Sequence, residues 1–409
     1  MIFSIVYVVY LIVCLLFGTV PFFGPITLRH MLTLVLFVWS IAEGGFKLDK
    51  FLRWYCVFLA FSAIGALLTG CMLPFANRLL GTYFSSIVLY ISTKIVIKKY
   101  NGFLWILYTL LSVCLLNAIV VIAQFYGSPL AFSIPEILHI DYSEEMLELY
   151  ERLDDFHGRY VGGVLGVVQS GYYLSAMIPL CLYNKKDAPT ILNWSLFIIT
   201  AFSLLLVQER AGLFIGILAF GLYYVICVKR KKRGIWTSFA VFVVLVVVLL
   251  RYGASLFSFD EMRYSTMGLE MGGRENLTSN GWHYFINNPL GGIDAYHIAG
   301  NRDPHTIFVN AFLHGGLFGG IVLLGIIIVQ SIKVGGVMIE AYTKKRHTQM
   351  LIVCSIAYLV YTLNSLAHNA SLASGVPTFF LYWAAVVSLL EKEKREKDVM
   401  VNSCKKVDQ

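Results

Sequence analysis

Charged residues are scarce in this chain, and their scarcity excludes most classes of soluble protein. Only 14% of the 409 residues are Asp, Glu, Lys or Arg, whereas 58% are hydrophobic, and the mean hydropathy is +0.73. A soluble globular chain has about 25% charged and about 45–50% apolar residues. The 10 prolines and 34 glycines are spread thinly, so no low-complexity segment is present. The composition indicates a membrane protein and excludes soluble, disordered and collagen-like chains.

Motifs for metal, redox and nucleotide chemistry are absent from the sequence. The chain has no CxxC pair, no HExxH helix and no GxxxxGK[ST] phosphate loop. Neither of the two long polar loops contains a cysteine, so no disulfide framework is expected there. The spacing of His283, His297 and His305 matches no standard ligand pattern. We therefore expect no metal site and no cofactor.

Apolar residues are abundant, and they occur in blocks close to the length of a membrane-spanning helix. A hydrocarbon core about 30 Å thick needs about 20 apolar residues to cross it. The first block lacks a basic start and a small-residue cleavage site, so we interpret it as a helix and not as a removed signal peptide. We predict an all-α polytopic membrane protein with about twelve transmembrane helices, at 2–20, 26–42, 52–73, 79–97, 103–126, 161–182, 191–208, 211–228, 236–252, 305–331, 349–367 and 373–390.

The basic residues predict the orientation of these helices. Loops that would face one side hold 17 lysines and arginines, and they are 43–53, 94–99, 183–190, 229–235 and 332–348. The positive-inside rule places these loops and both termini in the cytoplasm. Every lysine then lies inside, and the outer basic residues are all arginines. The basic runs are topology anchors beside anionic membrane lipid, so the net charge of +8 does not indicate nucleic-acid binding.

Two predicted outer loops are long, which is typical of functional segments in a compact protein. The first carries eight acidic residues against two arginines, and Met146, Leu149 and Leu153 predict a short amphipathic helix in it. The second is rich in aromatic residues. The chain is thus divided into helices one to five (1–126), an acidic outer loop (127–160), helices six to nine (161–252), a second outer loop (253–304), helices ten to twelve (305–390) and a cytoplasmic tail (391–409).

Arginines at the outer ends of helices are the most informative candidates. A guanidinium is a planar fork that binds a diphosphate through two parallel hydrogen bonds and stays charged when partly desolvated. Arg210 follows Glu209 in a break between two apolar helices, where a charge is costly and usually functional. A Glu209–Arg210 pair that only marks a tight turn is the alternative. Arg274 and Arg159 are weaker candidates by themselves, because an arginine in a loop is more commonly just exposed to solvent.

His305 and several glycine pairs mark the ends of other predicted membrane helices. His305 follows Pro304 where a loop enters the membrane, and a histidine at such a boundary can act as a base near neutral pH. A helix-start histidine that only hydrogen-bonds locally is the alternative. Small residues four apart predict close helix packing, in the pairs Gly162/Gly166, Gly212/Gly216, Gly315/Gly319 and Gly316/Gly320.

Four segments in order give the chain a family resemblance. They are Gly158-Arg159-Tyr160-Val161-Gly162-Gly163, Gln208-Glu209-Arg210-Ala211-Gly212, Gly273-Arg274 with Trp282 and Pro289-Leu290-Gly291-Gly292, and Pro304-His305-Thr306 through Gly316-Leu317-Phe318-Gly319. Over about residues 155–330 the chain resembles the O-antigen polymerase and O-antigen ligase superfamily of bacterial envelope glycosyltransferases. It departs from that pattern at Glu209, where a small residue is usual, and at Thr306, where Asn or Ser is common.

The resemblance implies an inverting, metal-independent glycosyl transfer from a glycan on undecaprenyl diphosphate to an acceptor sugar hydroxyl. By this resemblance Arg210 and Arg274 hold the diphosphate and stabilise the charge that develops as it leaves. His305 orients or deprotonates the acceptor hydroxyl, and Glu209 is the alternative base. Loop 253–304 is then the catalytic loop. We assign substrate binding to Arg159, Glu209, Trp282, His283 and Arg302.

In the superfamily that the chain resembles, polymerases are described as having two sizeable outer loops and ligases as relying mainly on the second. By this resemblance, the two long loops imply a polymerase of the bacterial inner membrane, acting in lipopolysaccharide biosynthesis on the periplasmic side. The expected partners are lipid-linked donor and acceptor glycans, membrane lipid and a chain-length regulator. The alternatives are a ligase that transfers the polymer to a lipid A-core acceptor, and a lipid-linked sugar transporter. A transporter should have internal repeats and charged groups at mid-membrane, and the sequence has no clear repeat and few such charges. A purely structural scaffold leaves the outer arginines unexplained.

Overall fold

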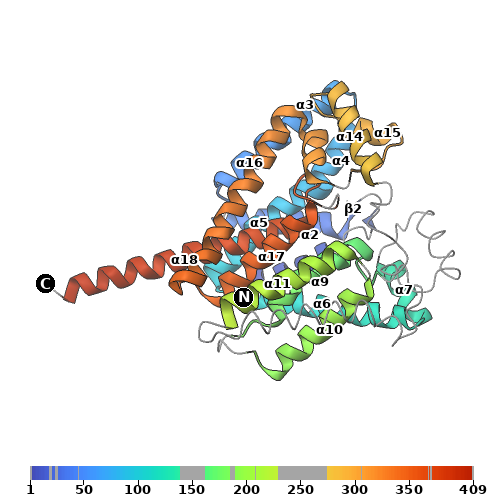
Figure 1. Ribbon diagram of the computed structural model, residues 1–409. Coiled ribbons are helices and arrows are strands. Elements are labelled where there is room, and N and C mark those ends of the chain that lie inside the picture. The colour runs from blue at the N-terminus through green and yellow to red at the C-terminus, as the bar shows by residue number, and fades with distance from the viewer. Residues whose placement is uncertain are drawn as a thin grey trace.

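The described part of the protein is mostly helical. The computed structural model describes residues 2–17, 21–23, 26–44, 46–138, 162–184, 189–207, 209–228, 274–304, 306–366, 368 and 371–407. Within these residues the only strands are β1 (Pro21–Phe23) and β2 (Ile26–Thr27), which form a short antiparallel pair. The predicted all-α class is confirmed (Figure 1).

The helices vary from one turn to more than ten turns in length. In chain order they are α1 (Ile2–Leu16), α2 (Leu28–Ala42), α3 (Lys50–Leu68), α4 (Met72–Arg78), the π-helical η1 (Leu79–Tyr83), α5 (Phe84–Tyr100), α6 (Phe103–Phe125), α7 (Pro129–Leu138), α9 (Val167–Cys181), α10 (Ile191–Val207), α11 (Arg210–Tyr223), η3 (Tyr224–Val228), α14 (Arg274–Asn287), α15 (Ile293–Ile298), α16 (Ile307–Lys344), α17 (Gln349–Ser365) and α18 (Pro377–Val407).

Several of these helices suit a membrane. Among the described residues, four helices are long and apolar enough to cross one, and they are Lys50–Leu68, Met72–Tyr100, Phe103–Phe125 and Ile307–Lys344. Shorter apolar helices lie at Ile2–Leu16, Leu28–Ala42, Ile191–Val207, Ala211–Cys227 and Gln349–Ser365. The count of twelve spans stays a prediction. The predicted helix at 236–252 lies outside the described residues, and so does the predicted amphipathic helix around Met146.

Two helices continue beyond the apolar segments that predicted them. The loop predicted at 332–348 is helical as far as Lys344, and the left-handed conformation of Lys345 (φ 50°) ends that helix. The predicted tail is helical to Val407, and in Figure 1 this end of α18 projects away from the other helices. Hydropathy marks only where apolar residues stop. A backbone helix continues through Glu, Lys and Arg, because these residues are good helix formers.

The central helices are held together by buried tyrosines as well as by apolar packing. Helix α9 packs against α10, α11 and α17, and α18 packs against α5 and α17. In Figure 1, α3 and α16 run side by side along one edge of the bundle. Tyr172 is 1% exposed and donates its hydroxyl hydrogen bond to the Asn364 carbonyl at 2.9 Å. A buried hydroxyl keeps its hydrogen bond in this way, so polar side chains fix how the helices pack.

Candidate functional site

The break between α10 and α11 is built around Glu209. This residue is the N-cap of α11, and its carboxylate accepts hydrogen bonds from the backbone N–H groups of Ala211, at 3.2 Å, and Gly212. The first N–H groups of a helix have no partner within the helix, so a capping carboxylate satisfies them and complements the helix dipole. The cap therefore fixes the residue at which α11 begins, which is Arg210.

The Glu209 carboxylate also pairs with a histidine far away in the sequence. His368 Nε2 lies 2.8 Å from Glu209 Oε1, and the two side chains are only 1% and 5% exposed. The His368 ring packs edge-on against Tyr172 of α9, with 5.4 Å between ring centroids. Removing one partner from a buried pair of this kind leaves an uncompensated polar or charged group and is strongly destabilising.

Glycines allow α9 and α11 to approach closely at this point. A Cβ atom on Gly212 would lie 2.5 Å from Glu209 Oε2 and 2.9 Å from the Gly171 carbonyl carbon. A Cβ on Gly216 would lie 2.7 Å from Leu204 Cδ2. The predicted close packing at Gly212 and Gly216 is confirmed. The prediction for Gly162/Gly166 is wrong, because both residues precede α9 and Gly166 has a left-handed φ of 78° as its N-cap.

A second part of the site forms where α16 is interrupted. Gly316 has φ 62° and ψ −169°, which are not helical angles. Residues 288–292, between α14 and α15, enter this break and replace helical hydrogen bonds. Leu317 N–H donates to the Pro289 carbonyl at 2.8 Å, and Gly292 N–H donates to the Leu313 carbonyl at 3.0 Å. Two segments that carry the family resemblance therefore meet through their backbones.

The same loop is wedged against α3. A Cβ on Gly65 would lie 2.6 Å from the Leu290 carbonyl oxygen, and one on Gly316 would lie 2.5 Å from the Leu290 carbonyl carbon. Nearby, Gly315 and Gly319 face Phe58 and Phe61 of α3, so the predicted helix packing of this pair is confirmed. For Gly316 the prediction was incomplete, because its main role is the backbone break.

An ion pair joins the α14–α15 region to the bundle. Arg78 ends α4 and Asp294 lies in the first turn of α15, and their side chains are 2.8 Å apart and 19% and 10% exposed. Burial outweighs the effect of Arg78 and raises the pKa of the Asp294 carboxyl. Below this pair, Tyr83 donates to the Ala373 carbonyl at 3.0 Å, so its hydroxyl accepts from His314 Nδ1 at 2.9 Å.

The segment between α17 and α18 connects the two parts. Its carbonyls at Leu372, Ala373 and Gly375 accept hydrogen bonds from Tyr55, at 3.1 Å, Tyr83, at 3.0 Å, and Ser86, at 2.6 Å. His368 in the same segment pairs with Glu209. The start of α11 and the Arg78–Asp294 contact are thus tied to one short segment, which places them at the same end of the helix bundle.

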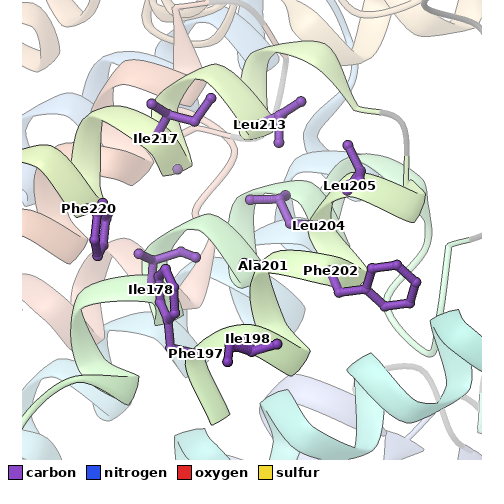
Figure 2. A pocket seen from close by; sticks show the side chains of 11 residues that line it. Ile178, Phe197, Ile198, Ala201, Phe202, Leu204, Leu205, Leu213, Ile217 and Phe220 are labelled. Carbon is purple, nitrogen blue, oxygen red and sulfur yellow. The ribbon is translucent and has the colours of Figure 1, made fainter. Parts of the chain in front are cut away.

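An apolar cavity lies next to the start of α11. It has a volume of about 260 Å³ between α9, α10 and α11, and Figure 2 shows that its labelled side chains contribute only carbon atoms. They include Ile178, Phe197, Leu204, Leu213, Ile217 and Phe220. Leu213 is one helical turn beyond Arg210. A chain of hydrocarbon character fits such a lining, and a polar ligand does not.

The predicted site residues are distributed over these elements. Arg210 and Arg274 are the first residues of α11 and α14, and the structure describes the backbone at both. Arg159 and His305 lie outside the described residues. Trp282 stacks on Phe285, with 5.4 Å between ring centroids, and remains 42% exposed.

His283 and Arg302, two further predicted substrate-binding residues, are exposed on α14 and in the segment before α16. Within the part of the chain that the structure describes, no group of three or more His, Cys, Asp and Glu residues could hold a metal ion.

Four residues of this region were not found by sequence reasoning, and they are Arg78, Asp294, His314 and His368. Arg78 and its partner Asp294 are 216 positions apart in the sequence. His368 and Glu209 are 159 positions apart. Local spacing carries no signal for such pairs. The one available signal was the position of ionisable residues beside apolar helices, which marks functional candidates by default.

Comparison with known proteins agrees with this geometry. A family model described as O-antigen ligase matches residues 195–324, which contain the α10–α11 break, the 288–292 loop and the interruption of α16. Among curated proteins, no relative matches the chain. The resemblance predicted from the sequence is confirmed by this match. Residues 195–324 of the chain are therefore similar to the family described as O-antigen ligase.

Proposed function

We propose that the protein is a polysaccharide repeat-unit polymerase of the bacterial inner membrane. It transfers a glycan from undecaprenyl diphosphate onto a lipid-linked repeat unit at the periplasmic face. One observation carries the proposal: an arginine-bearing helix start, fixed by the buried Glu209 cap, lies beside a cavity lined only by apolar side chains. A polyprenyl diphosphate has the matching chemistry, with an anionic head next to a hydrocarbon tail.

The donor diphosphate binds to Arg210 and Arg274, and the first isoprenoid units lie in the cavity of α9–α11. Both arginines open a helix, so the positive ends of two helix dipoles add to their guanidinium charges. A guanidinium fork matches a diphosphate better than an ammonium does, because it donates two parallel hydrogen bonds. Binding of the first isoprenoid units in the cavity takes their apolar surface out of contact with the polar headgroup region. It also fixes how deep in the membrane the diphosphate lies.

In the transfer step, an acceptor hydroxyl oxygen attacks the anomeric carbon of the donor sugar. The new carbon–oxygen bond forms as the bond from that carbon to the diphosphate oxygen breaks, with inversion. The hydroxyl proton passes to His305, and undecaprenyl diphosphate leaves with the added negative charge. Arg210 and Arg274 stabilise that charge. The sugar–diphosphate bond supplies the free energy, so the reaction needs no nucleotide.

The surroundings of Glu209 favour His305 over Glu209 as the base. Glu209 is 4% exposed, and its oxygens already accept hydrogen bonds from Ala211, Gly212 and His368. A general base must reach the proton that it removes, either directly or through one water. Glu209 therefore supports the site, and His305, at the end of the 288–304 segment, contacts the acceptor.

The exposed part of Trp282 offers a platform for a sugar ring of the acceptor or the growing chain. Contacts with the rings of Phe285 and Phe312, at 5.4 and 5.5 Å between centroids, hold the indole in place. The two long outer loops predicted from the sequence favour, by the family resemblance, a polymerase over a ligase. A ligase that transfers polymer to a lipid A-core acceptor is the second candidate, and the description of the matching family favours it.

A transfer assay tests the proposed function. Purified protein in proteoliposomes receives a lipid-diphosphate oligosaccharide with no ion gradient, and the products are separated by length. We expect the wild type to form longer lipid-linked glycans. The variants Arg210→Ala, Arg274→Ala and His305→Ala should each lose more than about 100-fold in rate. The control variant Arg346→Ala, at an exposed position, should keep full activity. Full activity of the three alanine variants contradicts the site. Movement of lipid-linked sugar across the bilayer without elongation indicates a transporter.

The same assay separates the two candidate transferases by their acceptors. One reaction contains only lipid-linked repeat units, and a parallel reaction adds lipid A-core. Elongation in the first reaction supports the polymerase. Product only in the second supports the ligase, with the arginines and His305 in the same roles.

A further inference from the structure

Glu209 and His368 form a buried ionisable pair that the transfer chemistry itself does not require. Both side chains are almost completely buried, with 5% and 1% exposed. Burying two ionisable groups is costly, and such a pair more often specifies an arrangement than adds net stability.

The contacts of Glu209 indicate that the pair fixes the start of α11. Its carboxylate accepts hydrogen bonds from the N–H groups of Ala211 and Gly212, which follow Arg210 in the first turn of α11. His368 holds the same carboxylate from the other side at 2.8 Å. Without His368, the Glu209 side chain loses one of its three hydrogen-bond donors, and the cap is free to adopt other rotamers. The backbone position of Arg210 then becomes less well defined.

His368 is suitable as an anchor because its segment is fixed to other helices. The carbonyls of Leu372, Ala373 and Gly375 accept hydrogen bonds from buried side chains of α3, η1 and α5. The His368 ring also rests against Tyr172, and Tyr172 is in turn bound to the Asn364 carbonyl. The histidine therefore transmits the position of the central helices to the N-terminus of α11.

We propose that His368 is a positioning residue that acts through Glu209 to set the place of Arg210 against the donor diphosphate. The proposal rests on the proposed function, because it assigns Arg210 to diphosphate binding. A misplaced guanidinium weakens donor binding and transition-state stabilisation together. His368 does not touch the substrate in this role.

Direct donor binding and steady-state kinetics test the role. We expect His368→Ala to raise the KM for the lipid-linked donor by about tenfold or more, to lower kcat, and to weaken binding of undecaprenyl diphosphate to a similar extent. His368→Gln places an amide N–H near the position of Nε2, so it should restore at least half of the wild-type affinity. His347→Ala is the matched control. It breaks another His–Glu pair, with Glu393 at 2.7 Å, and should leave the KM unchanged.

Glu209→Ser separates positioning from general stabilisation. Serine caps a helix well but cannot reach across to pair with His368. We expect Glu209→Ser to raise the KM for the donor. Adding His368→Ala to this variant should raise the KM further by less than twofold. Equal effects of His368→Ala in the wild-type and Glu209→Ser backgrounds overturn a role through Glu209. If His368→Ala alone fails to fold, His368→Gln and the double variant supply the same comparison.

The two proposals fail in different ways. A wild-type donor KM and affinity in His368→Ala, together with an inactive Arg210→Ala variant, overturn the positioning role and leave the proposed function intact. Full activity of Arg210→Ala overturns the proposed function first.

Discussion

At the scale of single residues, charged side chains at one end of the bundle have partners far away in the sequence. Arg78 pairs with Asp294 and Glu209 with His368, and all four side chains are less than a fifth exposed. Sequence reasoning identified Glu209 and the outer arginines from hydropathy and residue type. It could not find their partners, because a contact across 159 or 216 positions depends on how helices pack and leaves no local pattern.

We predict that Arg78→Ala destabilises the protein by about 1–3 kcal/mol, because it leaves the largely buried Asp294 carboxylate without its charged donor. Thermal unfolding of the purified protein in detergent measures the effect, as a shift in the temperature of the first unfolding transition. Lys344→Gln is the control, because Lys344 is 56% exposed and its pair with Glu340, at 3.9 Å, contributes little. An equal and small shift for both variants means that the Arg78–Asp294 pair does not hold α15 in place.

At the scale of elements, the interruption of α16 is the feature that joins two of the family segments. The glycines of these segments were predicted to allow helix packing, and Gly315 and Gly319 do so. The insertion of residues 288–292 at Gly316 was not predictable, since GxxxG spacing is the same for a straight helix and for a broken one. The left-handed φ of Gly316 is visible only when the loop that fills the break is known.

Gly316→Ala tests the break directly. The new Cβ would lie 2.5 Å from the Leu290 carbonyl carbon on a backbone with φ 62°, so we expect a loss of more than about 2 kcal/mol and strongly reduced folded protein. Gly325→Ala in the same helix is the control. Nothing lies within 4 Å of its Cβ position, and alanine favours a helix over glycine by about 1 kcal/mol. Similar yields and unfolding temperatures for both variants contradict a required break at Gly316.

At the opposite end of the bundle, the Glu393 carboxylate binds the turn between α16 and α17. Glu393 of α18 accepts hydrogen bonds from Thr348 N–H, at 2.7 Å, and His347 Nδ1, at 2.7 Å, and thereby holds the α16–α17 turn. Burial raises the pKa of Glu393, but the contacts with His347 and Thr348 outweigh it and bring the pKa below the usual value of 4.5.

A carboxylate with a lowered pKa in the folded state stabilises the fold above its ordinary pKa, and this contribution is lost as the pH falls through the folded-state value. The wild type should therefore unfold at a higher temperature than Glu393→Gln above about pH 4.5, and this difference should shrink as the pH falls below that value. A constant difference down to pH 3 contradicts the role of the Glu393 charge.

At the scale of the whole molecule, a bundle of apolar helices brings separate arginine-bearing segments to one end. The all-α class and the similarity to the O-antigen ligase family were predictable, because hydropathy and the order of four short motifs can be read without knowledge of the tertiary structure. The extent of α16 and α18 was not, since helical hydrogen bonding continues where apolar residues stop. The segment between α17 and α18 had no motif at all, although it connects both parts of the candidate site.

The central claim is that Arg210, Arg274 and His305 share the outer face of the membrane and act on one lipid diphosphate. Single cysteines at positions 210, 274 and 305, in a variant whose eight native cysteines are replaced by alanine, test it most directly. Intact cells or right-side-out vesicles are treated with a membrane-impermeant maleimide, and a cysteine at position 346 marks the inner face. We predict labelling from outside at 210, 274 and 305 and not at 346. Labelling of any of the three only from the inner side contradicts the claim.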